Sequence, residues 1–190
     1  KKINNIITTY KYITITYIYI YIYTMAGILP MAKHNGELYF LFGRERRYPK
    51  WRDSKLWSDF GGAIDKGETK MDAAIREGYE EMNGFLGSIE DMKRLMHEKL
   101  VTVISSTNYA TFIVEIDYSE ELANKFATLY DDIYKNDRNK LLKRDGMYEK
   151  DMAKWVSYKE LQELKKESRV FYKKNISYII KYFKYIKNKM

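Results

Sequence analysis

The sequence of 190 residues contains no cysteine and only two histidines, His34 and His97. The absence of cysteine excludes a disulfide framework, a zinc site with cysteine ligands and a cysteine nucleophile. Two histidines are also too few for a histidine-rich metal cage. A metal site in this chain must therefore be built from carboxylates, which are the ligands of hard divalent cations.

Acidic residues are nearly missing from the two ends of the chain. The chain has 34 Lys and Arg against 26 Asp and Glu, which gives a net charge of +8 and a pI near 9.3. Residues 1–24 and 164–190 together hold 12 of those bases and one acid, Glu167. Residues 25–163 consequently have three more acids than bases. The basic pI describes the two ends, and does not by itself identify the partner of the body.

The first 24 residues are a low-complexity leader in which Ile and Tyr supply 14 positions. Alternating Tyr and Ile from Tyr17 to Tyr23 suits a strand, but both of its faces would be apolar. We interpret Met25 as the true start, with the leader untranslated or disordered; a signal peptide is the alternative. The leader is too short and too polar for a transmembrane helix, and we expect a cytoplasmic (intracellular) protein without a transmembrane segment.

Hydrophobic periodicity predicts strands and helices that mix without strict alternation. A basic loop rich in Trp is expected at 44–59, and a polar loop at 135–148. We expect strands at 38–42, 100–104, 110–118 and 153–157, and helices at 72–82, 119–134, 158–165 and 168–187. Thr69 and Ser119 are the expected N-caps of the first two helices. This pattern indicates an α/β (α+β) fold with a mixed β-sheet and helices packed on it.

Three glutamates in the helix expected at 72–82 carry the clearest chemical signal. Glu77, Glu80 and Glu81 fall at i, i+3 and i+4, so they share one helix face. Like charges so close together repel each other, and a divalent cation such as Mg²⁺ or Mn²⁺ would relieve that repulsion. The alternative is a solvated acidic helix face.

Residues around the glutamates complete a longer pattern. Arg76 is placed to pair with Glu68, and a Gly61-Gly62 pair allows close backbone approach. The spacing is Gly62, five residues, Glu68, seven residues, Arg76-Glu77, two residues, Glu80-Glu81. This spacing resembles the Nudix box of the Nudix hydrolase family. In that family the box is a loop–helix–loop that holds divalent cations against a diphosphate.

The resemblance extends over roughly residues 26–165 and implies a Nudix-like α/β/α sandwich. Trp57 and Phe60 before the box, and Glu149 and Trp155 after it, are similar to segments of such domains. The implied organisation is a Nudix domain over 25–165 with an insertion at about 119–148. A basic amphipathic C-terminal helix follows at 166–190, with its apolar face packed on the body or on a second subunit, as in a homodimer.

The resemblance also implies a role for each candidate site residue. Glu77, Glu80, Glu81 and the Gly61 carbonyl would hold the metal, Glu68 and Arg76 would orient loop and helix, and Glu149 would act as general base. The basic, aromatic loop would bind the substrate through Arg44, Arg46 and Trp57.

The box departs from the family pattern at three positions. Gly78 stands where an apolar residue is usual, and glycine costs a helix interior about 1 kcal/mol relative to alanine. Asn83 stands where the family has a glycine, but asparagine also tolerates the left-handed conformation of a helix end. Gly84 replaces the apolar residue that follows.

The resemblance predicts a Mg²⁺-dependent (or Mn²⁺-dependent) hydrolase that cleaves a diphosphate linkage in a nucleoside diphosphate derivative. Its partner would be a nucleotide-derived small molecule. One alternative is an mRNA-decapping enzyme, with RNA bound through the basic loop and the C-terminal helix. The alternative of another class is a non-catalytic Nudix-like module that binds nucleotide or RNA.

Overall fold

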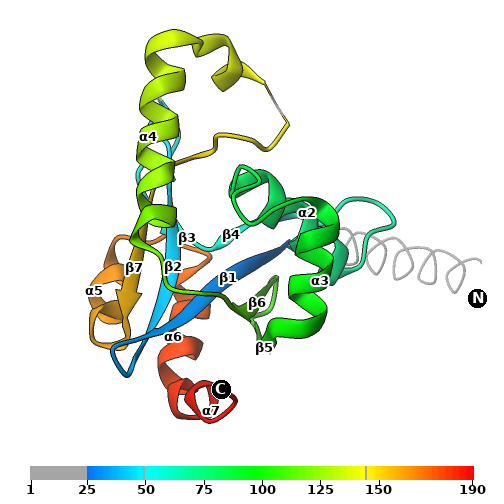
Figure 1. The fold of residues 1–190 in the computed structure, drawn as a ribbon, viewed down its shortest axis with the longest axis vertical. Coiled ribbons are helices and arrows are strands. Elements are labelled where there is room, and N and C mark those ends of the chain that lie inside the picture. Colours follow the sequence, from blue (N-terminus) through cyan, green and yellow to red (C-terminus); the bar gives the residue numbers. More distant parts are fainter. Residues whose placement is uncertain (1–24, 49, 144) are drawn as a thin grey trace, which may run out of the picture.

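The computed structural model describes residues 25–48, 50–143 and 145–190. The leader at 1–24, with its alternating Tyr and Ile, lies outside the described residues. The strands are β1 (Met25–His34), β2 (Glu37–Glu45), β3 (Trp57–Ser58), β4 (Phe60–Ala63), β5 (Leu100–Ser105), β6 (Tyr109–Glu115) and β7 (Lys150–Ser157) (Figure 1). The helices are α2 (Lys70–Glu81), α3 (Ile89–Lys99), α4 (Glu120–Asn136), α5 (Leu161–Lys166), α6 (Lys173–Lys181) and α7 (Phe183–Lys187), with short 3-10 turns at Arg138–Leu142 and Tyr158–Glu160.

A mixed sheet of seven strands forms the centre of the molecule. Its main order is β3-β2-β1-β6-β5, with β4 added on β1 and β7 on β2. β1 and β6 run parallel, whereas β1–β2, β1–β4, β2–β7 and β5–β6 are antiparallel. The mixed sheet expected from the sequence is therefore confirmed.

Helices cover both faces of this sheet. Successive residues of β1 point to opposite faces, and each contacts different helices. Ile28 packs in a buried cluster with residues of α2 and α3. Its neighbour Leu29 packs in a second cluster with residues of α5, α6 and α7. α4 covers β7, where Phe126 and Trp155 belong to a third cluster. The layers confirm the predicted α/β/α sandwich.

Two of the predicted helices begin at their predicted caps. Thr69 Oγ1 accepts a hydrogen bond from Asp72 N at 3.1 Å, and the Asp72 carboxylate accepts one from Thr69 N at 3.1 Å. This reciprocal capping box fixes the start of α2. Ser119 Oγ likewise accepts from Leu122 N at 3.1 Å at the start of α4.

Other sequence-based assignments need correction. The loop expected at 44–59 is shorter, because β2 continues to Glu45 and β3 begins at Trp57. The predicted loop at 135–148 contains the end of α4 and a 3-10 turn. α3 was not predicted at all: it has a capping box at Ser88, but its buried residues are Met92 and Met96 alone. With so few apolar positions on one face, the sequence of α3 shows little of the hydrophobic periodicity that predicts a helix.

The last helix begins later than its sequence pattern predicts. Ser168 forms an isolated bridge with Trp57, with Trp57 N donating to Glu167 O and Arg169 N to Trp57 O, both at 3.0 Å. The chain turns helical only at Lys173, and the helix is interrupted at Tyr182. The predicted apolar face packs on the body, where Ile176, Ile179 and Ile186 are fully buried. No helix in the described part of the chain is long and apolar enough to cross a membrane.

Candidate active site

The two glycines of β4 bring the start of the box against its helix. Gly61 faces Gly27 of β1, and a Cβ on Gly61 would lie 2.3 Å from the Gly27 Cα. A Cβ on Gly62 would lie 2.6 Å from both carboxylate oxygens of Glu77. These distances are shorter than van der Waals contacts, so a side chain at either position would displace its neighbours. The absence of side chains lets the Glu77 carboxylate lie against the backbone of β4.

Gly62→Ala is expected to reduce catalysis far more than stability. The new methyl group meets the mobile end of Glu77, so this carboxylate moves and the backbone need not. Misplacing a catalytic group by about 1 Å costs on the order of 100-fold in rate. Gly61→Ala is the contrasting variant, because its methyl group meets backbone atoms and should destabilise the fold. Urea unfolding and steady-state kinetics of both variants measure the difference; equal loss of activity and stability in Gly62→Ala would contradict it.

Arg76 binds the loop to the acidic face of α2. Its Nε and Nη2 donate to the two oxygens of Glu68 at 2.7 and 3.0 Å, which is a bidentate pair. Its Nη2 also donates to the Ala63 carbonyl at 2.9 Å. The spacing of Arg76 and Glu68 predicts this pair, and the structure contains it.

The same guanidinium contacts two of the predicted metal ligands. Nη1 of Arg76 donates to Glu77 Oε1 at 2.8 Å and lies 3.2 Å from Glu80 Oε2. Burial raises the pKa of both glutamates above the usual range, and Arg76 partly offsets this. Their charged forms are therefore short of solvation and benefit from a nearby cation.

Glu81 lies deeper and has different partners. Its Oε2 accepts a hydrogen bond from Gly61 N at 2.6 Å and lies 3.2 Å from Lys150 Nζ. Lys150 also pairs with Glu45, and both side chains are fully buried. Burial raises the pKa of Glu81 well above its usual range, although Lys150 acts in the opposite direction. No motif in the sequence indicates Lys150, which enters from β7.

The segment before β7 brings Glu149 to the same place. Asn83 adopts the left-handed conformation expected of it, with φ of 54°, and its Oδ1 accepts a hydrogen bond from Tyr148 N at 2.8 Å. A glycine at this position could not make that contact. The negative charge of Glu149 contributes to the raised pKa of Glu77 and Glu80, so four acidic groups act on one region.

The structure also explains why a glycine stands at position 78. A Cβ there would lie 2.7 Å from Ile28 Cδ1 and 3.1 Å from Met92 Cε. The missing side chain lets α2 pack closely on β1 and α3. This packing offsets the low helix propensity of glycine at the position where the family has an apolar residue.

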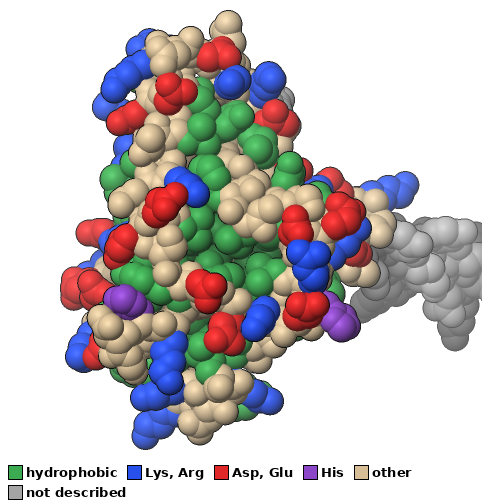
Figure 2. Space-filling model, viewed as in Figure 1, with side chains coloured by type: hydrophobic (Ala, Val, Ile, Leu, Met, Phe, Trp, Pro, Cys, Tyr) green, Lys and Arg blue, Asp and Glu red, His purple; other side chains and the backbone are tan. Residues whose placement is uncertain are grey.

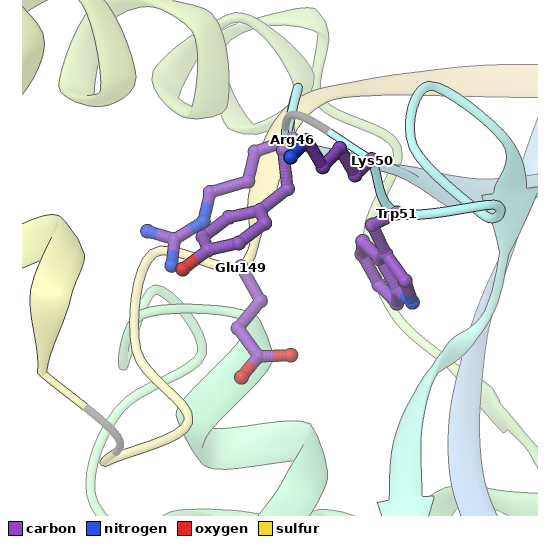
Figure 3. Close-up of a pocket in the computed structure, with 5 residues that line it drawn as sticks. Arg46, Lys50, Trp51 and Glu149 are labelled. Carbon is purple, nitrogen blue, oxygen red and sulfur yellow. The ribbon is translucent and has the colours of Figure 1, made fainter.

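Two adjoining cavities surround these groups. The first, of about 580 Å³, is lined by the carboxylates of Glu77, Glu80, Glu81 and Glu149 together with Arg76, Arg169 and Trp51. The second, of about 420 Å³, is lined by Arg46, Tyr48, Lys50, Trp51 and Glu149 (Figure 3). Trp51 and Glu149 belong to both linings. An acidic cavity therefore adjoins a basic and aromatic one.

The structure distributes the three predicted substrate residues differently. Arg46 lines the second cavity, where its Nη2 donates to the Leu141 carbonyl at 2.7 Å. Arg44 instead pairs with the buried Asp151, Nε to Oδ1 at 2.8 Å, and lines neither cavity. Trp57 is a core residue with 5% of its surface exposed, which leaves little ring to stack on a base. Trp51, 39% exposed, is the tryptophan that lines both cavities.

The donor set fits a hard divalent cation, but the side chains need to turn to bind one. Within the described ranges no three acidic side chains are already grouped as metal ligands. The reason is that Glu77 and Glu80 face Arg76, while Glu81 faces Gly61 N and Lys150. Binding a cation requires Glu77 and Glu80 to turn from Arg76, which keeps Glu68 as its partner. All-oxygen ligands and mutually repelling carboxylates favour Mg²⁺ or Mn²⁺.

Comparison with solved structures supports the fold. The chain is similar to a Nudix hydrolase from M. smegmatis, with a TM-score of 0.52 and 16% identity over 86% of this chain and 88% of that one. It is also similar to an Ap4A hydrolase of C. elegans, with a TM-score of 0.50 and 17% identity over 86% of this chain and 98% of that one.

Comparison by sequence identifies the family. An uncharacterised protein of Acanthamoeba polyphaga mimivirus is 49% identical over 57 residues, which are 30% of this chain and 18% of that protein. The family model of the NUDIX domain matches residues 24–175. This match confirms the predicted family and, at the level of the family, the predicted enzyme class, a hydrolase of pyrophosphate bonds. The chain belongs to the Nudix family.

Proposed function

We propose that this chain is a Mg²⁺-dependent (or Mn²⁺-dependent) hydrolase that cleaves the diphosphate linkage of a nucleoside diphosphate derivative. One observation carries the proposal: the cavity lined by four glutamates shares Trp51 and Glu149 with an adjoining basic and aromatic pocket. Acidic groups suit the cation that accompanies a diphosphate, and cations with aromatic rings suit a phosphorylated base. Because all three glutamates of α2 are present, a non-catalytic binding module is the weaker alternative.

The residues of α2 and β4 divide the work of such a reaction. Glu77, Glu80, Glu81 and the Gly61 carbonyl would hold the cation, which would neutralise phosphate charge and lower the pKa of a water molecule. Arg76 and Glu68 fix the glycine loop relative to the helix. Glu149 lines both cavities, which supports a role as the general base that accepts the proton of the attacking water.

The second cavity is suited to the nucleoside end of the substrate. Trp51 offers an exposed ring for stacking, and the Arg169 guanidinium lies 5.4 Å from the centre of that ring. Arg46 and Lys50 supply positive charge for a phosphate. The pocket can thus hold one nucleoside of a dinucleoside polyphosphate; one solved neighbour is named an Ap4A hydrolase.

Trp51→Ala is expected to raise KM about tenfold and to change kcat little. Base–aromatic stacking contributes about 1–3 kcal/mol, and 1.4 kcal/mol corresponds to a factor of ten. Tyr134→Ala is the matched control, because Tyr134 is 46% exposed but lies on α4 and lines neither cavity. A KM for Trp51→Ala within twofold of the unmodified protein would exclude the stacking role.

A second candidate is removal of the cap from RNA. The basic and aromatic pocket beside the carboxylates favours it, because capped RNA also carries a nucleoside next to its phosphate bridge. The two candidates share the metal site and differ only in substrate.

A substrate panel tests the proposal. Nucleoside triphosphates, ADP-ribose, diadenosine polyphosphates and capped RNA are each incubated with and without Mg²⁺, and products are separated by chromatography. We expect Mg²⁺-dependent cleavage of at least one of them at a diphosphate bond. No metal-dependent turnover of any substrate would contradict the enzymatic proposal, and preference for capped RNA would select the second candidate.

A further inference from the structure

A groove separate from the catalytic cavities lies between the C-terminal helices and strand β5. It has a volume of about 590 Å³ and is lined by Thr102, Val103, Ile104, Ser105, Tyr178, Lys181, Tyr182 and Tyr185. None of these residues lines the two cavities at the box. β5 is the end strand of the main order of the sheet, so the groove follows a sheet edge.

Tyrosine rings on one side of the groove are accessible to solvent. Tyr182 and Tyr185 are 42% and 52% exposed, so their rings are available to a ligand. The apolar face of the same helices is already buried in the core through Ile176, Ile179 and Ile186. Tyr182 and Tyr185 therefore lie outside the buried apolar face of these helices.

Each of these tyrosines has a lysine beside its ring. Lys181 Nζ lies 5.1 Å from the ring centre of Tyr182, Lys189 Nζ lies 5.4 Å from that of Tyr185, and Lys174 Nζ lies 5.9 Å from that of Tyr178. Exposed rings interleaved with ammonium groups combine stacking surface with positive charge.

Neither of the two segments that line the groove contains an acidic residue. Residues 173–190, which form the C-terminal helices, have no Asp or Glu and hold six bases: Lys173, Lys174, Lys181, Lys184, Lys187 and Lys189. Strand β5 on the other wall has no charged residue. Figure 2 shows Lys and Arg side chains around the end of the molecule where α7 lies. The charge of this surface is complementary to a polyanion.

We propose that this tyrosine–lysine groove binds single-stranded RNA. Unpaired bases present the faces that tyrosine rings stack on, and the lysines neutralise phosphates. Thr102 and Ser105 on the opposite wall supply hydroxyl groups, which can hydrogen-bond to ribose 2′-hydroxyls. A second copy of this chain is a poorer occupant, since two such basic surfaces repel each other. The proposal does not depend on the catalytic function.

Fluorescence anisotropy with a labelled oligouridylate of 12 nucleotides tests the proposal on the full chain. We expect salt-dependent binding that Tyr182→Ala/Tyr185→Ala weakens at least about tenfold. Lys181→Gln should lower the slope of log affinity against log salt by about 0.7, the value for one lost phosphate contact. Tyr134→Ala is the control: its ring is exposed and has the Arg138 Cζ at 4.1 Å, but it lies on α4.

The outcomes separate the possible occupants. The double variant replaces exposed rings, so circular dichroism should show an unchanged fold. Absent RNA binding, or equal binding by the natural chain and the double variant, would overturn the proposal. Equal affinity for oligothymidylate would overturn the assignment to RNA. A dimer in light scattering that the double variant dissociates, without any change in RNA affinity, would assign the groove to a second copy instead.

Discussion

Replacing Glu80 by Gln is expected to lower kcat for diphosphate hydrolysis about 100-fold or more. The amide keeps the size of the side chain but removes a charge from the acidic face of α2, where Glu80 shares Arg76 with Glu77. A cation held there loses one anionic ligand, and loss of one such electrostatic contribution typically costs about 10²–10³ in rate. The fold should be little affected, because glutamine has nearly the same size as glutamate and Arg76 keeps its bidentate pair with Glu68.

Steady-state rates of Glu80→Gln at saturating Mg²⁺ measure this effect, with a cleaved substrate from the panel. Glu121→Gln is the matched control: its side chain is 79% exposed on α4 and pairs with Lys125. The control should retain full activity. A kcat of Glu80→Gln within about threefold of that of the natural chain would show that Glu80 is not a required metal ligand.

Substituting Lys150 by Met should destabilise the fold by about 3–5 kcal/mol, the usual cost of removing one partner from a buried ion pair. Lys150 is fully buried between Glu45 and Glu81, and its ammonium also donates to Ser58 Oγ at 3.1 Å. Without it, two buried carboxylates lose their shared cation, and Arg169 remains only beside Glu45, at 2.9 Å. Methionine fills a similar volume, so the loss reports charge and not a cavity.

Urea unfolding of Lys150→Met and of Lys159→Met provides the comparison. Lys159 pairs with Glu37 at 3.1 Å, but its side chain is 80% exposed, and such surface pairs contribute about 0–1 kcal/mol. A loss in Lys150→Met no larger than in Lys159→Met would show that the buried charges do not depend on Lys150.

The sequence predicted those parts of the site that are local in the chain. The spacing of Glu68, Arg76 and the three glutamates determines which of them share a helix face, and the Arg76–Glu68 pair follows from it. Capping residues Thr69 and Ser119 marked the starts of α2 and α4 for the same reason. Helix geometry alone is sufficient for these inferences.

Contacts between distant segments could not be predicted in this way. Lys150 reaches Glu45 and Glu81 only because β7 pairs with β2 and α2 packs on β1 and β4. The choice between Trp51 and Trp57 depends on which ring the sheet buries, and both belong to the loop expected at 44–59. Arg169 enters the catalytic cavity through the bridge between Ser168 and Trp57, which no periodicity reveals.

Binding of Mn²⁺ to the protein, followed by electron paramagnetic resonance, tests most directly whether α2 holds a divalent cation, and it requires no knowledge of the substrate. The natural chain and the Glu121→Gln control should bind Mn²⁺ alike. Glu77→Gln/Glu80→Gln should bind it at least about tenfold more weakly, as expected when ligands are lost. Equal Mn²⁺ affinity in the double variant and the natural chain would contradict a metal site at these carboxylates.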